Sequence, residues 1–249
     1  MSIEDAKQLE ARASAASEAV AKLWRPDAEI ILNLIDTGIT LVIVAGPGGS
    51  GKSEHLAPNI VNVGQEKNFH PVYFDCQMLP NPASGAIADT FERRQKNYHP
   101  KKGLVILDEP PYEASEEVIE KDLSYLHKQK SAVVVALVRT QQQERTLVDK
   151  WVTAERSLGG KVNVYDLQPK QLPKDLAREL LTALYRTPQT VVAYITDNFP
   201  LYPRVLDHLR GANDENGVIK LWQDMTSKIH AGWGFTEEEA GIVTSNLRV

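Results

Sequence analysis

The chain has 249 residues, of which 42% are hydrophobic and 24% are charged; this is an ordinary globular composition, long enough to bury a core. The formal net charge is −5 and the pI is near 5.7, so nucleic-acid binding would need a local basic patch. One cysteine, Cys76, excludes an internal disulfide framework. The sequence lacks a secretory signal and any apolar run long enough for a membrane span. We therefore expect no secretion, no membrane partner, and a cytoplasmic location, or a nuclear one in a eukaryote.

The first predicted elements are two helices. Residues 3–24 place apolar side chains at alternating spacings of four and three, which forms a narrow seam on one helix face. The seam consists of Leu9, Ala13, Ala16, Val20 and Leu23. It packs either on the chain's own domain or against a neighbouring subunit. Pro26 ends this helix, and a second helix is predicted at about 27–36.

Short apolar runs then predict five strands, at 39–45, 71–75, 104–107, 132–138 and 162–167. Helical patterns lie between most of them, including 85–97 and 115–128. Strands that alternate with helices predict a mostly parallel sheet with helices on both faces.

After Pro169 the pattern is helical only. Four short helices are predicted, at about 173–185, 188–198, 203–210 and 217–229, three of which begin near a proline. A tail follows, with one further helix predicted over 236–245. We expect four regions: N-terminal helices at 1–37, an α/β domain at 38–168, a helical domain at 169–230 and a tail at 231–249.

A phosphate-binding loop is the strongest motif. Residues 46–53 fit the pattern GxxxxGK[ST] directly after the predicted strand 39–45. Glycines let backbone N–H groups turn toward a phosphate, and the helix that follows points its positive end at the anion. Lys52 is expected to reach the β- and γ-phosphates, and the Ser53 hydroxyl is expected to bind Mg²⁺. The predicted ATP-binding residues are Gly46, Pro47, Gly48, Gly49, Ser50, Gly51, Lys52, Ser53 and Glu54.

An acidic pair follows a second apolar strand. Four apolar residues at 104–107 lead into Asp108 and Glu109, which is the Walker B pattern. Asp108 is expected to face the metal and its water shell, and Glu109 is expected to polarise the attacking water. The alternative is a strand that ends in two surface acids. An ABC-type ATPase is excluded because no LSGGQ-like signature precedes this strand.

The order of these elements resembles an AAA+ ATPase over roughly residues 25–230. The stretch HPVYFDCQMLPNPASGAIADTF resembles the second strand and helix of origin-recognition, transposition-regulator and STAND-type ATPases. The resemblance implies an α/β P-loop NTPase of the additional-strand class. It should have a five-stranded, mostly parallel sheet with helices on both faces, followed by a small all-α lid.

The resemblance implies three further site residues. Thr140, at the end of strand 132–138, is the expected sensor 1 residue, with Arg139 as the alternative. Arg156 is the expected arginine finger, which would reach the nucleotide of a neighbouring subunit, and Arg145 is its competitor. Arg204 is the expected sensor 2 residue. The other interpretation is that these are solvated side chains at element ends.

The function predicted from these motifs is Mg²⁺-dependent ATP hydrolysis, coupled to assembly of a homo-oligomer. A basic cluster at residues 93–102, which includes Tyr98, makes nucleic acid a candidate partner; a solvated helix end is the alternative. No aromatic pore loop follows the second strand, which disfavours polypeptide threading, and the scattered histidines indicate no zinc site. The alternative function is a STAND-type regulatory switch that acts on protein partners.

Overall fold

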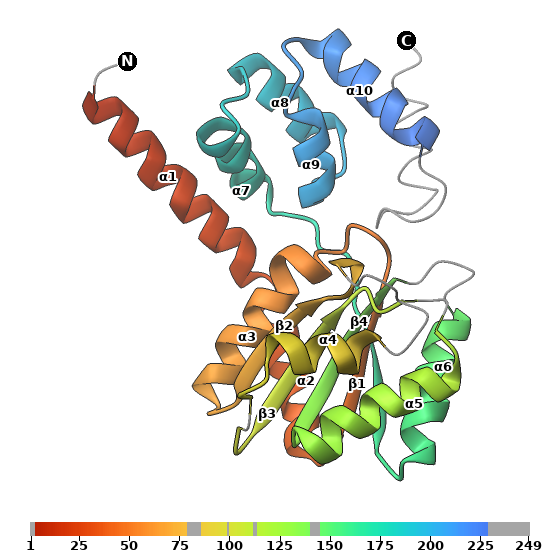
Figure 1. Cartoon of the computed structure of the whole chain (residues 1–249). Helices are drawn as coiled ribbons and strands as arrows, with labels where there is room; N and C mark the ends of the chain where they lie inside the picture. Colours follow the sequence, from red (N-terminus) through yellow and green to blue (C-terminus); the bar gives the residue numbers. More distant parts are fainter. Residues whose placement is uncertain (1–2, 79–85, 99, 112–113, 140–144, 229–249) are drawn as a thin grey trace. The chain divides into compact units, whose positions relative to one another are not determined.

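The structure is a computed structural model of the chain, and it describes residues 3–78, 86–98, 100–111, 114–139 and 145–228 (Figure 1). The chain divides into two compact units. The first comprises Met1–Leu23, Pro47–Gly51 and Gln168–Val249, and the second comprises Trp24–Gly46 and Lys52–Leu167. The predicted tail at 231–249, with its helix at 236–245, lies outside the described residues.

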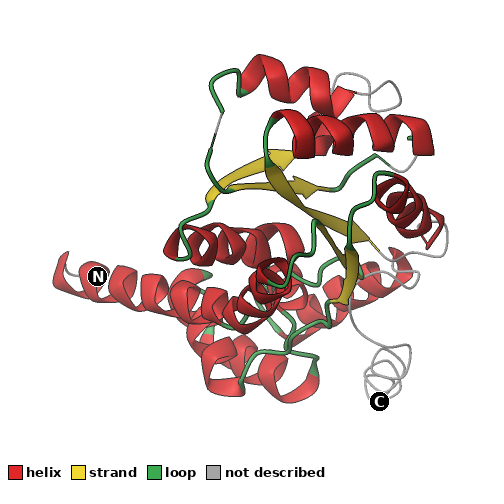
Figure 2. Cartoon of the chain, turned by 90° about the horizontal axis from the view of Figure 1, so that it is seen from below, coloured by secondary structure: helices red, strands yellow, loops and turns green. Residues whose placement is uncertain are grey.

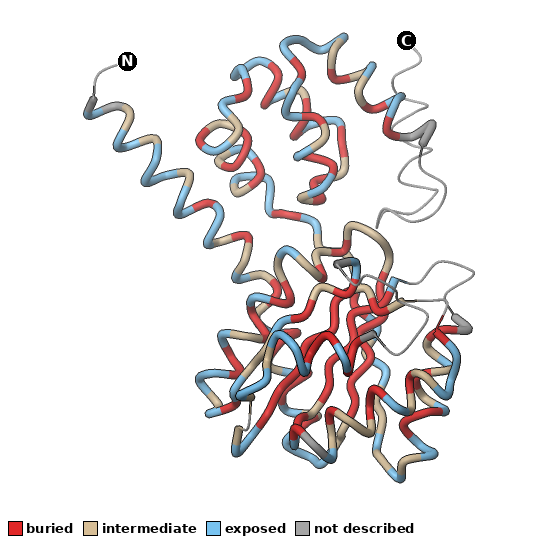
Figure 3. Tube along the Cα trace, in the orientation of Figure 1, coloured by how far each residue is buried: buried red, intermediate tan, exposed pale blue. Residues whose placement is uncertain are grey.

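A five-stranded sheet forms the centre of the second unit, and every strand pair in it is parallel. Its order is β2-β3-β4-β1-β5, which confirms the predicted fold class and all five strands. The strands are β1 (Leu41–Gly46), β2 (His70–Asp75), β3 (Gly103–Asp108), β4 (Ala132–Arg139) and β5 (Val162–Asp166). Strands β1 and β3 are buried along their whole length (Figure 3), as the unbroken runs of Val, Ile and Leu predict for strands covered on both faces.

Helices cover both faces of this sheet (Figures 1 and 2). On one face lie α2 (Arg25–Asp36) and α3 (Ala57–Glu66). On the other face α4 (Ala86–Arg94), α5 (Glu116–Ser124) and α6 (Arg145–Ser157) enclose a hydrophobic cluster with the strands. The sequence analysis delimits neither α3 nor α6. Two π-helical turns, η1 (Lys52–Leu56) before α3 and η4 (Tyr125–Gln129) after α5, continue these helices.

Polar side chains fix the start of α4 and of α5. The Ser115 hydroxyl accepts the backbone N–H of Val118 at 3.4 Å, and two glutamates follow in the first turn of α5. This is the N-terminus that the sequence predicts. The Asp122 carboxylate, on α5, accepts the backbone N–H of Ala88 at 3.0 Å in the first turn of α4. This hydrogen bond connects α5 to α4. Burial raises the pKa of Asp122 to about 6.

The first unit is helical in its described part. Its elements are α1 (Ile3–Lys22), α7 (Lys174–Glu179), the π-helical turn η5 (Leu180–Leu184), α8 (Gln189–Asn198), α9 (Pro203–Leu209) and α10 (Glu215–Lys228). Helix α1 packs on α7 and η5, and its seam residues Ala16 and Val20 are buried. The Arg12 guanidinium donates two hydrogen bonds, of 2.6 and 2.8 Å, to Glu179. The α1 seam therefore packs on this chain's own helices.

Among the helices in the described part of the chain, none combines the length and the apolar composition that a membrane crossing needs.

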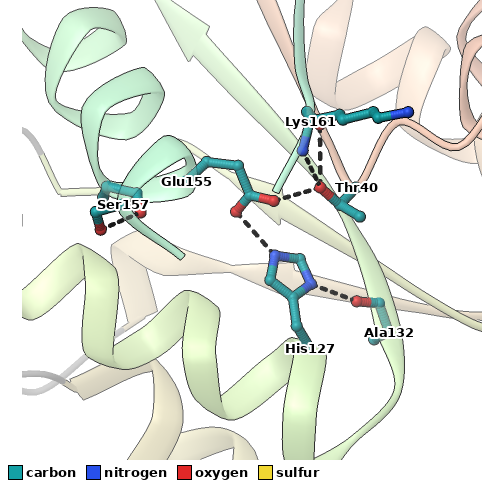
Figure 4. A network of polar contacts seen from close by, with 7 residues as sticks. Thr40, His127, Ala132, Glu155, Ser157 and Lys161 are labelled. Carbon is teal, nitrogen blue, oxygen red and sulfur yellow. Dashed lines mark hydrogen bonds and ion pairs between the residues drawn. The ribbon is translucent and has the colours of Figure 1, made fainter. Parts of the chain in front are cut away.

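A buried polar network joins η4, α6 and Thr40, the residue before β1, at the amino ends of the strands (Figure 4). The Glu155 side chain on α6 is fully buried and accepts a hydrogen bond from the Thr40 hydroxyl. The ring of His127 lies 2.9 Å from Glu155 through Nε2 and 2.7 Å from the carbonyl oxygen of Ala132 through Nδ1. Gly160 allows this approach, because a Cβ there would lie 1.9 Å from Glu155 Oε1.

This network makes stability depend on pH. Burial opposes a charge on His127, but the hydrogen bonds to Glu155 and Ala132 outweigh it and raise its pKa. Because the folded pKa lies above the unfolded value of about 6.5, the stabilisation is fully present below pH 6.5 and is lost as pH rises through the folded pKa. We therefore expect the free energy of unfolding to fall between pH 6 and pH 9, as measured by urea denaturation.

The matched variant is Glu155→Gln, which keeps an acceptor for Thr40 and removes the charge beside His127. Its unfolding free energy should fall less than that of the wild type over the same range, whatever its absolute stability. Equal slopes for the two proteins would contradict this role for His127.

Candidate active site

The candidate site lies where three strands of the second unit end. Because the strands are parallel, the carboxyl ends of β1, β3 and β4 meet at one edge of the sheet. Gly46, the last residue of β1, pairs with Arg139, and Asp108, the last residue of β3, pairs with Leu137. Gly46, the last residue before the phosphate loop, and Asp108 are thus brought to the same edge by strand order and register.

The phosphate loop has the backbone that its glycines predict. Gly49 and Gly51 have φ values of 82° and 85°, a left-handed region that glycine adopts at no steric cost. The Lys52 side chain is only 5% exposed, and its ammonium group donates to the carbonyl oxygen of Gly46 at 2.6 Å. Lys52 also begins the π-helical turn η1. A buried cation is therefore held at the end of β1.

Asp108 is the buried acid of the pair. It is 4% exposed, and its Oδ2 accepts a hydrogen bond from the Tyr73 hydroxyl, on the neighbouring strand β2. Burial, and then the bond to Asp108, raise the pKa of Tyr73 well above its usual value, so the phenol stays protonated and donates. Oδ1 of Asp108 is buried and, within the described ranges, has no hydrogen-bond partner.

An unsatisfied buried carboxylate oxygen calls for a cation or a water molecule. The described residues contain no cluster of three or more histidine, cysteine or acidic ligands. Mg²⁺ does not need one, because it is usually held by one or two protein oxygens together with phosphates and waters. The orphaned Oδ1 of Asp108 therefore suits the single protein oxygen that a magnesium ion needs.

Glu109 has an unusual backbone and two side-chain partners. Its φ is 51°, which is rare for a residue other than glycine, and its N–H donates to the carbonyl oxygen of Leu137 on β4 at 3.1 Å. One carboxylate oxygen forms an ion pair with Arg139, and the other accepts a hydrogen bond from Gln77, just after β2. Side chains from three strand ends thus meet at Glu109.

Of the other predicted site residues, one contacts Glu109, others are exposed, and one lies outside the described residues. Thr140 lies outside the described residues, whereas Arg139, its alternative, contacts Glu109. Arg156 is exposed near the end of α6, and Arg145 begins the same helix. Arg204 is exposed in the first turn of α9, in the first unit. Their roles stay predictions.

Two contributors to the site, Tyr73 and Gln77, are not predicted from the sequence. Both lie in the stretch that resembles the second strand and helix of related ATPases, but nothing in its local pattern shows which strand lies beside β2. The one available signal is the polar character of residues near the end of β2. Such side chains will lie beside the end of whichever strand pairs with β2.

The predicted basic cluster is partly engaged within the chain. Lys102 pairs with Asp36 at 3.1 Å, and Arg93 bonds the Thr90 hydroxyl at 3.2 Å. The Tyr98 hydroxyl donates to the carbonyl oxygen of His70 and accepts the N–H of Leu104 at 3.1 Å. Tyr98, in the loop after α4, is therefore bound to the sheet by its hydroxyl, and its ring packs edge-on against Phe91.

Comparisons with known proteins identify the fold. No protein-family model matches the sequence, and no curated protein matches it. Among solved structures, a Walker-type ATPase of Pyrococcus abyssi is similar with a TM-score of 0.52 and 12% identity, over 82% of this chain and 72% of that one. Domain III of the replication initiation protein DnaA from Thermotoga maritima matches with a TM-score of 0.40 and 16% identity, over 94% and 91%.

Another match is the replication initiator DnaA bound to AMPPCP and single-stranded DNA, with a TM-score of 0.42 and 12% identity, over 76% of this chain. This chain spans 59% of the length of that protein. The assignment of the fold rests on the Pyrococcus ATPase and on the strand order.

The left-handed backbone of Glu109 yields a stability prediction. Glu109→Gly and Glu109→Ala remove the same carboxylate and the same contacts, but only alanine keeps the strain of a positive φ, roughly 1–2 kcal/mol. This strain exceeds the unfolded-state advantage of alanine, about 0.4–1 kcal/mol. We expect the glycine variant to be more stable by about 1 kcal/mol in urea unfolding. A more stable alanine variant would show that position 109 is unstrained.

Proposed function

We propose that the chain, whose fold is that of a P-loop ATPase, binds ATP together with Mg²⁺ and hydrolyses it in the manner of an AAA+ ATPase. The observation that carries this proposal is that two buried polar groups stand at the carboxyl ends of two strands of one sheet. The Lys52 ammonium is held at the end of β1, and the Asp108 carboxylate at the end of β3 keeps one oxygen without a hydrogen-bond partner among the described residues. A triphosphate with its magnesium ion satisfies both charges.

The loop residues bind the phosphates. The left-handed glycines Gly49 and Gly51 let N–H groups turn toward the β-phosphate, and Lys52 exchanges the Gly46 carbonyl for phosphate oxygens. Ser53 and Asp108 hold the metal. Mg²⁺, when bound, neutralises charge that develops on the β- and γ-phosphates.

Glu109 is the proposed general base. To polarise a water molecule, its carboxylate has to exchange at least one of its present partners, Arg139 or Gln77, for that water. Arg139 then becomes available to the γ-phosphate, which is the sensor role that the resemblance assigns to this strand end. Hydrolysis is thus coupled to a rearrangement of side chains from β2, β3 and β4.

A second candidate function is a nucleotide-gated switch that hydrolyses ATP slowly. The engagement of the Glu109 carboxylate by both Arg139 and Gln77 favours it, because a base held in this way activates water rarely. The hydrolysis rate of the wild type separates the two candidates.

Homo-oligomer assembly is part of the proposal. Arg156 is exposed, and no ion pair of its guanidinium is found in the part of the chain that the structure describes. A permanently charged group with several fixed donors suits a contact with the nucleotide of a neighbouring subunit.

Nucleic acid enters the proposal through the cluster at 93–102. Of its cations, Arg94, Lys96 and Lys101 are exposed, while Lys102 pairs with Asp36. Contacts of these exposed side chains with a phosphate backbone would make assembly on nucleic acid sensitive to salt.

Glu109→Gln tests the catalytic assignment. The amide retains the shape and an acceptor for Arg139, but it cannot take a proton from water. We expect unchanged ATP affinity by calorimetry and a hydrolysis rate lower by about 10²–10⁴-fold. The control is Glu117→Gln, at an exposed position in α5.

A wild-type rate in the Glu109→Gln variant would exclude Glu109 as the base. If the wild type itself binds ATP but hydrolyses it no faster than the Glu109→Gln variant, at a rate near that of the uncatalysed reaction, the switch function is the correct one.

Mixing two inactive variants tests the role of Arg156 across subunits. Arg156→Ala should bind ATP normally but hydrolyse it slowly, because an arginine finger contributes about 10³–10⁵ in related reactions. It still provides Glu109, whereas Glu109→Gln still provides the finger. Equal amounts of the two should therefore recover activity at mixed interfaces, beyond that of either variant alone. No recovery, with a wild-type specific activity independent of concentration, would identify Arg156 as a surface side chain.

A further inference from the structure

Tyr73 lies beside the metal-binding aspartate but belongs to neither sequence motif. It is on β2, where its backbone pairs with Ile106 of β3, two residues before Asp108. The residue is 43% exposed, yet its hydroxyl donates to Oδ2 of Asp108. A large aromatic side chain thus remains partly in solvent while its polar end bonds a buried carboxylate.

This hydrogen bond makes the two carboxylate oxygens of Asp108 unequal. Oδ2 is occupied by the phenol, and Oδ1 is buried without a hydrogen-bond partner among the described residues. Rotation about the terminal bond of an aspartate is otherwise broad and nearly two-fold. A fixed hydrogen bond on one oxygen restricts this rotation and leaves the other oxygen as the metal ligand.

We propose that Tyr73 is a positioning residue for magnesium, and that it holds Asp108 so that Oδ1 alone faces the ion that accompanies ATP. The inference rests on the proposed function, which it deepens by naming the residue that aligns the metal ligand. Mg²⁺ demands near-ideal octahedral geometry, so a ligand held in one orientation binds it better than a freely rotating one. Hydrogen-bond partners of metal ligands typically contribute 10–100-fold to metal affinity.

The chain contains a matched control for this contact. Tyr165, on β5 at the other edge of the sheet, donates its hydroxyl to Asp27 of α2 at 2.6 Å. Tyr73→Phe and Tyr165→Phe therefore remove the same atom from the same type of tyrosine–aspartate pair within one unit. Only the first of these pairs contains an aspartate of the candidate site.

The experiment measures the affinity for ATP by calorimetry, once with excess Mg²⁺ and once with EDTA, for the wild type and both phenylalanine variants. Tyr73→Phe should weaken ATP binding about 10-fold or more in Mg²⁺ and leave binding in EDTA unchanged. Tyr165→Phe should resemble the wild type in both buffers. Urea unfolding of the three proteins shows how much stability each hydroxyl provides.

A double-mutant cycle with Asp108→Asn provides the second measurement. If Tyr73 acts only through Asp108, Tyr73→Phe should change the Mg²⁺-dependent affinity less than about two-fold once Asp108 is replaced.

Three results would overturn the inference. In the first, wild type and Tyr73→Phe bind ATP equally well in Mg²⁺. In the second, Tyr73→Phe weakens binding equally in Mg²⁺ and EDTA, which identifies a purely structural residue. Either result leaves the proposed function intact. A wild type that binds no ATP in either buffer would overturn the proposed function as well.

Discussion

The candidate site depends on one constraint, which is that all five strands run in the same direction. Parallel strands bring their carboxyl ends to one edge, and β4 lies between β1 and β3. Residues far apart in the sequence, Gly46, Asp108 and Arg139, therefore end at neighbouring positions. A strand that ran the other way would carry its polar end to the opposite edge of the sheet. The burial of β1 and β3 along their whole length fixes this arrangement, because reversing either strand would require the core to be rebuilt.

The polar groups at this edge are held by protein partners. Lys52 bonds the carbonyl oxygen of Gly46, Glu109 is engaged by Arg139 and Gln77, and Asp108 has one oxygen on Tyr73. Such contacts hold the side chains in place before the ligand arrives, which reduces the entropy lost on binding. They also have to be exchanged when phosphate, metal and water enter. The same contacts would therefore organise the site and limit its rate, and this connects the proposed ATPase function with its slower alternative, the switch.

The sequence predicts the parts of this structure that local spacing determines. The apolar run 39–45 before the glycine loop predicts β1. The apolar run 104–107 before the two acids predicts β3. The contacts of Tyr73 with Asp108, and of His127 and Thr40 with Glu155, could not be predicted in this way. The paired residues lie 35, 28 and 115 positions apart, and only strand order and helix packing bring them together. The π-helical turn η4 also escaped prediction, since the apolar period of residues 115–128 is that of an ordinary helix.

The central claim is that Lys52, held at the end of β1, binds the phosphates of ATP. Isothermal titration calorimetry of ATP with Mg²⁺ into the wild type and into Lys52→Ala tests it most directly. Lys52→Arg, which keeps the charge but changes the geometry of its donors, serves as the comparison. The account predicts binding to the wild type, loss of binding in the alanine variant and intermediate affinity in the arginine variant. Equal ATP affinity in the wild type and in Lys52→Ala would contradict it.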